Sequence, residues 1–150
     1  MRVEAPIKVD RKTKKLAKRL SAGEIAVINH IDIDEVAANS LVECKIKLVI
    51  NAAPSISGRY PNKGPKILID NNILIIDNVG ENVFEELKEG QVIEVNNGQI
   101  YRDGQFIGSG EVMDKSVVEK RTQIAYENMS VELDRFIDNT IEYAKREKGF

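Results

Sequence analysis

Short apolar runs separated by turn-forming residues fill the first two thirds of the chain. Mostly aliphatic runs cover residues 25–29, 47–50 and 73–77. Runs of this length are too short for typical helices and suit strands that are buried on both faces. We predict strands there, and a further strand over 3–9 that Pro6 interrupts. Helical patterns separate these strands, which is typical of an α/β fold.

Two of the intervening helices carry recognisable end signals. Gly64-Pro65 opens a short helix that reaches Asn71, because proline suits a first helical turn. The other helix is predicted over 33–44, with Asp32 as its N-cap and Glu35 completing a capping box. Residues at helical spacing form its predicted inward face, namely Val36, Ala37, Ser40, Leu41 and Cys44.

Two tight turns follow the third apolar run. Asn96-Asn97-Gly98 and Arg102-Asp103-Gly104 each separate short segments with strand-like alternation. Asn-Gly and Asp-Gly are the preferred residues of two-residue hairpin turns. The sequence therefore predicts two consecutive β-hairpins before residue 112.

The last third of the chain has a different pattern. Apolar residues recur at steps of three and four between 115 and 148, and this stretch contains no proline or glycine. The pattern predicts one long amphipathic helix. Its length exceeds that of a usual globular helix, so we expect its apolar face to pack on a second copy of the chain or on another domain. Because the chain stops in this pattern, we also expect the protein to continue beyond it.

Composition narrows the range of functions. The chain has 150 residues, 42% hydrophobic composition and a net charge of -2, which suit one globular domain with a helical extension and argue against a dominant nucleic-acid surface. It has one cysteine, Cys44, so an internal disulfide framework is excluded, and we expect this thiol to be a half-buried filler. No signal peptide or membrane-spanning segment is evident, so we expect a cytoplasmic location.

Two clusters of charged or ligating residues allow more than one interpretation. The basic stretch 11–20 is either a patch for nucleic acid or another acidic partner, or a solvated helical turn, which we favour. Steep salt dependence of binding would indicate nucleic acid. His30, Asp32 and Asp34 could ligate a metal, but their spacing matches no established pattern, and we favour the capping role for Asp32.

The loop between the run 47–50 and the helix at Gly64 is the strongest candidate for a binding site. Loops that leave a strand and enter a helix are where α/β folds place their ligands. A helix start together with Arg59 and Lys63 would attract an anion. Alternatively, this loop is an ordered connector whose charges are solvated.

Residues 73–80 and 87–101 resemble the phosphohistidine swivelling domain of phosphotransferases that use phosphoenolpyruvate, and the strand at 23–27 and the turn at 57–59 also align with it. In that family, a histidine at a helix start carries phosphate. This chain has Asn62 and Lys63 there, and its only histidine is His30. The resemblance therefore implies the scaffold and a noncovalent anion site, for which we predict Ser55, Ser57, Gly58, Arg59, Tyr60, Asn62 and Lys63.

A second resemblance covers nearly the whole chain. Residues 11–20, 23–30, 51–62 and 139–143 resemble the N-terminal part of SteA-like proteins, a bacterial cytokinetic-ring family. The resemblance implies a role in cell division and cell separation, through partner proteins that control cell-wall hydrolysis. It also implies a following domain similar to the catalytic domain of thiamine pyrophosphokinase.

Together, these observations predict a swivelling-type β/β/α layered domain over residues 1–112 and a long helix over 113–150. We expect a non-catalytic interaction module, with no catalytic residues and no metal, that takes no cofactor beyond a phosphate or nucleotide ligand. Its expected partners are a second copy, bound through the C-terminal helix, and a cell-division protein. We expect either this partner or a following C-terminal part of the protein to recruit it to the membrane or septum. The alternative is an enzyme domain of phosphate chemistry, related to phosphotransferases or thiamine pyrophosphokinase.

Overall fold

One sheet contains all eight strands of residues 1–147, the residues that the computed structural model describes. The strands are β1 (Arg2–Val9), β2 (Ile25–Ile28), β3 (Leu48–Asn51), β4 (Leu74–Asp77), β5 (Val92–Asn96), β6 (Gln99–Arg102), β7 (Gln105–Ser109) and β8 (Glu111–Met113). The helices are α1 (Thr13–Ala17), α2 (Glu35–Glu43), α3 (Gly64–Asp70), α4 (Glu81–Glu86) and α5 (Lys115–Glu147). The strand order is β7-β6-β5-β1-β2-β3-β4-β8.

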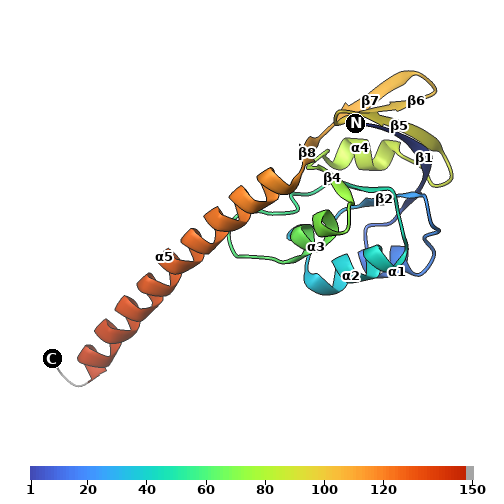
Figure 1. Cartoon of the computed structure of the whole chain (residues 1–150). Helices are drawn as coiled ribbons and strands as arrows, with labels where there is room; N and C mark the ends of the chain where they lie inside the picture. The colour runs from blue at the N-terminus through green and yellow to red at the C-terminus, as the bar shows by residue number, and fades with distance from the viewer. Residues whose placement is uncertain (148–150) are drawn as a thin grey trace.

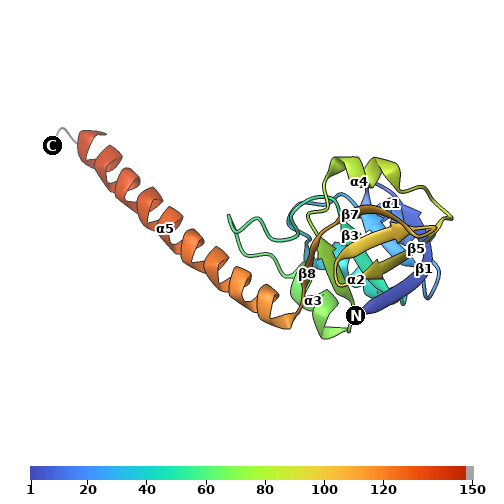
Figure 2. The same cartoon turned by 90° about the horizontal axis from the view of Figure 1, so that it is seen from above.

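The parallel strands β1 to β4 explain why the apolar runs are continuous. Successive side chains of a strand point to opposite faces, and both faces of these strands are covered. In β2, Ala26 and Ile28 enter the core under α1, α2 and α3, whereas Ile25 and Val27 enter a second core with α4, β5 and β6. The helices α1, α2 and α3 therefore cover one face of the parallel strands, and α4 packs with β5 and β6 against the other face (Figures 1 and 2).

The antiparallel part of the sheet contains the two predicted hairpins. Asn97 and Gly98 between β5 and β6 have φ values of 49° and 87°, and Asp103 and Gly104 between β6 and β7 have φ values of 52° and 76°. Two consecutive positive φ angles are the requirement of the turn type that Asn-Gly and Asp-Gly favour. Both predictions are confirmed, whereas the three-residue strand β8, which pairs with β4, was not predicted.

Two details of the predicted elements were wrong. The strand β1 continues through Pro6, because its antiparallel pairing with β5 ends at Pro6 and its parallel pairing with β2 begins at Ile7. The helix α2 is capped by Asp34, which accepts a hydrogen bond from the Ala37 amide at 2.7 Å. Asp32 has a φ of 52° and lies outside the helix.

The predicted inward face of α2 also needs correction. Its buried residues are Ala37, Ala38 and Leu41, whereas Val36, which was predicted to face inward, is 77% exposed. Ala38 lies beside Ala37 and Leu41 on the helix surface and replaces Val36 in the core.

The long helix α5 leaves the body of the fold soon after its first turns (Figures 1 and 2). Val118 and Ala125 are buried against the body, and every residue at 131–146 is exposed. The α/β layered class and the long C-terminal helix are thus confirmed, although the predicted helix positions 148–150 lie outside the described residues. Among residues 1–147, no helix is apolar over a length that would cross a membrane.

Candidate functional site

Polar residues close the apolar runs of β3 and β4 and anchor the central loop 51–65. Asn51 is fully buried, and its amide oxygen accepts a hydrogen bond from the His30 amide at 3.0 Å. The Asn51 amide nitrogen donates to the His30 carbonyl and to the Ser55 hydroxyl, both at 2.8 Å. These bonds join the segment after β2 to the start of the loop, because parallel strands end at the same edge of a sheet.

Asp77, at the end of β4, holds the loop from the other side. Both the amide and the hydroxyl of Ser55 donate to Asp77 Oδ1, at 2.9 and 2.7 Å. Burial raises the pKa of Asp77, and the Ser55 hydrogen bonds and the Arg121 guanidinium at 3.8 Å act in the opposite direction. Sequence reasoning did not single out Asn51 or Asp77, although a polar residue that ends each apolar run was the available signal.

Ser57, like Ser55, donates hydrogen bonds from both its amide and its hydroxyl to a carboxylate. Its amide donates to Asp32 Oδ1 at 2.7 Å, and its hydroxyl donates to Asp32 Oδ2 at 2.9 Å. The hydroxyls of Ser55 and Ser57, predicted to bind an anion, therefore both donate to carboxylates. The predicted anion site consequently depends on the charges of Arg59 and Lys63.

The tip of the loop contacts α5. Asn128 donates to the Gly58 carbonyl at 2.7 Å, and the Arg59 guanidinium lies over the ring of exposed Tyr60, 5.4 Å from its centroid. Lys63 and Asn62 border a cavity of about 460 Å³ that Tyr126 of α5 also lines. The structure thus places Arg59 at the loop tip and Lys63 beside α5.

Asn62 has a structural role in this arrangement. Its amide nitrogen donates to the carbonyls of Ile33 and Ser55, at 2.9 and 2.8 Å. Its amide oxygen is buried, and no hydrogen-bond partner for it lies within the described residues. Asn62 therefore fixes the return of the loop toward α3.

The anion prediction for the loop can be tested by thermal unfolding. We expect inorganic phosphate to raise the melting midpoint of the wild type and to raise that of the Arg59→Ala/Lys63→Ala variant much less, because a ligand stabilises only the state that binds it. Arg135→Ala, which removes an exposed charge from α5, is the control and should retain the shift. An equal shift in all three proteins would contradict a site in the loop.

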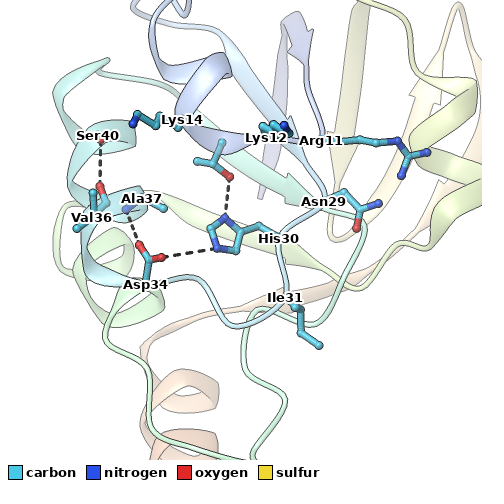
Figure 3. Close-up of a pocket in the computed structure, with 11 residues that line it drawn as sticks. Arg11, Lys12, Lys14, Asn29, His30, Ile31, Asp34, Val36, Ala37 and Ser40 are labelled. Atoms are coloured by element: carbon cyan, nitrogen blue, oxygen red, sulfur yellow. Dashed lines mark hydrogen bonds and ion pairs between the residues drawn. The ribbon is translucent and has the colours of Figure 1, made fainter.

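A larger cavity, of about 680 Å³, opens at the carboxyl ends of β1 and β2 (Figure 3). His30 lies in it, with Nδ1 2.8 Å from the Thr13 hydroxyl and Nε2 4.0 Å from Asp34 Oδ2. Asp32, the third residue of the less favoured metal interpretation, accepts hydrogen bonds from Ser57 instead. Within residues 1–147, no group of three or more ligating side chains is placed to hold a metal.

The basic stretch 11–20 forms α1 and its flanks. Leu16 is buried in the core, which explains why this stretch folds onto the body. Arg11 pairs with Glu81, and Arg19 pairs with Glu89 and Asp10. Acidic residues thus neutralise the two arginines, in agreement with the favoured interpretation of a helical turn.

Cys44 packs as a partly buried residue. Its Sγ lies 3.2 Å from the Ala17 carbonyl oxygen and 3.3 Å from that of Ser40, so its single proton can be donated to either. Burial raises the pKa of the thiol, which disfavours the reactive thiolate. The predicted role of a half-buried filler agrees with this environment.

Comparisons with known proteins add little to this description. No protein-family model matches the chain, and no curated protein matches it. A crystal structure of 3-isopropylmalate dehydratase (leuD) from Methanocaldococcus jannaschii is similar over 90% of this chain and 99% of that one, with a TM-score of 0.47 and 12% sequence identity. A likeness at this level carries no argument about function.

Proposed function

We propose that this chain is a non-catalytic interaction module of a SteA-like bacterial cell-division protein. The resemblance of residues 11–20, 23–30 and 51–62 to that family supports the cellular role, which is the control of cell separation and cell-wall hydrolysis. In this proposal, the chain reaches the septum through a protein partner, and a thiamine-pyrophosphokinase-like domain follows α5.

The observation that carries the proposal is the uncovered apolar stripe of α5. Phe136 is 68% exposed, and other large apolar side chains beside it are exposed as well, namely Leu133, Ile137, Ile141 and Tyr143. Contiguous exposed apolar surface on a folded protein marks an interaction site. A helix of this composition gains stability when a partner covers the stripe.

A second copy of the chain suits this stripe. Its residues follow steps of three and four, the spacing with which two helices pack, at Tyr126, Met129, Leu133, Phe136, Thr140 and Tyr143. One flank of the stripe is uncharged, with Ser130, Ile137 and Ala144, and the other carries Glu132, Asn139 and Arg146. The interface between the two α5 helices would therefore be largely apolar along the stripe and its uncharged flank.

Light scattering after size-exclusion chromatography tests this interface. We expect the wild type to be a dimer and Leu133→Glu/Phe136→Glu to weaken dimerisation by about a hundredfold or more, because dimerisation would bury two carboxylates from each chain without partners. A circular-dichroism spectrum should show that the variant keeps its fold, since both residues are exposed in one chain.

Val131→Glu is the matched control. Val131 is also exposed and apolar, but it lies on the opposite side of α5 from Phe136. The control should remain dimeric. A wild type that stays monomeric at high concentration would overturn the proposed self-association. In cells, a fluorescent fusion of the wild type should gather at septa.

A further inference from the structure

The cavity at the carboxyl ends of β1 and β2 has the position and size of a small-molecule site. The start of α1 and the N-terminal half of α2 form its walls, and Asn29, His30 and Ile31 after β2 line it between them (Figure 3). Ligands of open α/β sheets bind at this edge. The volume, about 680 Å³, lies within the range of small-molecule pockets.

Positive charge exceeds negative charge in the lining. Lys12 and Lys14 contribute two cations, Arg11 is already paired with Glu81, and Asp34 is the only carboxylate among the lining residues. Within residues 1–147, the ammonium groups of Lys12 and Lys14 form no ion pair. The negative charge of Asp34 is partly offset by the α2 N-terminus, because Oδ1 accepts the capping hydrogen bond from the Ala37 amide. The lining therefore favours an anion.

His30 adds an oriented ring to the same cavity. The Thr13 hydroxyl, on the buried side of α1, contacts Nδ1. Asp34, the N-cap residue of α2, faces Nε2 (Figure 3). The hydrogen bond with Thr13 orients the imidazole, with the Asp34 carboxylate on its other side. A ring oriented in this way offers its flat surface to a ligand with little loss of side-chain freedom on binding.

Apolar residues form the rest of the cavity. Val36 is 77% exposed and Ile31 is 59% exposed, and both line the cavity with Ala37. Exposed aliphatic side chains beside lysines suit a ligand that has an apolar or planar body as well as a charged group. Inorganic phosphate would leave these residues uncovered.

We propose that this cavity binds a small organic phosphate of the size of a nucleoside monophosphate. Lys12 and Lys14 would hold the phosphate by charge-assisted hydrogen bonds, and Ile31 and Val36 would cover the base or another planar group. This site is separate from the loop that contains Arg59 and from the apolar stripe of α5, so it goes beyond the proposed interaction function.

Calorimetric titration with adenosine 5′-monophosphate, adenosine and inorganic phosphate tests the proposal. We expect the nucleotide to bind, and adenosine and phosphate each to bind at least about tenfold more weakly, because each lacks one half of the recognised chemistry. The chain has one histidine, so the His30 ring signal in a proton NMR spectrum reports the location directly. It should shift with the nucleotide.

Charge-matched variants locate the site. Lys12→Gln/Lys14→Gln should weaken nucleotide binding by about tenfold or more, because both lost charges line the cavity. Lys15→Gln/Lys18→Gln removes the same charge from exposed positions of the same segment that do not line the cavity, and it should bind as the wild type does. Arg59→Ala/Lys63→Ala and Leu133→Glu/Phe136→Glu should also bind normally, which separates this proposal from those for the loop and α5.

Three results would overturn the proposal. The first is the absence of nucleotide binding to the wild type. The second is an equal loss in Lys12→Gln/Lys14→Gln and Lys15→Gln/Lys18→Gln, because it would indicate attraction by the general field of the protein. The third is a His30 signal that does not move while the nucleotide binds, because binding would then lie elsewhere.

Discussion

Gly64→Ala is expected to lower the free energy of unfolding by about 3 kcal/mol or more, although it adds a single methyl group. A Cβ at residue 64 would lie 2.2 Å from the Ile33 carbonyl oxygen, far inside van der Waals contact. That oxygen accepts hydrogen bonds from the Gly64 amide at 3.1 Å and from Asn62 at 2.9 Å. The clash would therefore displace the bonds that close the central loop.

The neighbouring backbone has little room to yield. The Ile33 amide donates to the Ser55 carbonyl at 3.2 Å, and the Ile33 side chain is fully buried in the core. Ile33 can move only if the loop and the core both shift. Chemical unfolding followed by circular dichroism, with the linear extrapolation to water, measures the loss.

Gly90→Ala is the control, because it adds a methyl group that strains the backbone but meets no neighbouring atom. Gly90 has a φ of 85° and no atom within 4 Å of an added Cβ, so alanine there should cost only about 1 kcal/mol of backbone strain. If Gly64→Ala destabilises the protein no more than Gly90→Ala does, the close approach of α3 to Ile33 is wrong.

The elements of this fold could be predicted where a local signal decides the conformation. The apolar runs of β2, β3 and β4 and the two hairpin turns were identified because burial on both faces and positive φ angles each restrict the residue types. The left-handed Asn72 after α3, with a φ of 62°, also follows from local preference.

Predictions failed where two local signals compete. Asp32 and Asp34 are both suitable N-caps, and the choice is made by Ser57, which engages Asp32 from another part of the chain. Similarly, Pro6 argues against a central strand, yet the pairing of β1 changes from one neighbour to the other at this residue. Neither outcome can be read from nearby sequence.

In the candidate sites, too, some features follow from local sequence and others depend on residues far away in the chain. The loop 51–65 was identified from its place between a strand and a helix, but the use of the Ser55 and Ser57 hydroxyls depends on distant carboxylates. The cavity around His30 joins two segments that follow adjacent parallel strands, β1 and β2. The strand order was needed to bring Lys12 and His30 together.

Asp77→Ala is expected to destabilise the protein by about 3 kcal/mol, because the buried Ser55 amide and hydroxyl would both lose their acceptor. Arg121 would also lose its contact with the end of β4, which loosens the attachment of α5 to the body. Asp138→Ala on the exposed part of α5 is the control, and it should change stability by less than about 0.5 kcal/mol. Equal effects of the two substitutions in chemical unfolding would contradict the role of Asp77 as the anchor of the loop.

The pH dependence of stability gives Asp77 a second, independent test. Burial raises the pKa of its carboxyl above the ordinary value that it has in the unfolded chain. Between these two values, the folded state holds a proton that the unfolded state has released, so this group's contribution to stability falls as the pH rises through that interval. Asp77→Asn keeps the shape but cannot titrate. The difference in unfolding free energy between wild type and Asp77→Asn should therefore favour the wild type most at acid pH and decline toward neutral pH. If this difference instead grows in favour of the wild type as the pH rises, the Ser55 and Arg121 contacts outweigh burial.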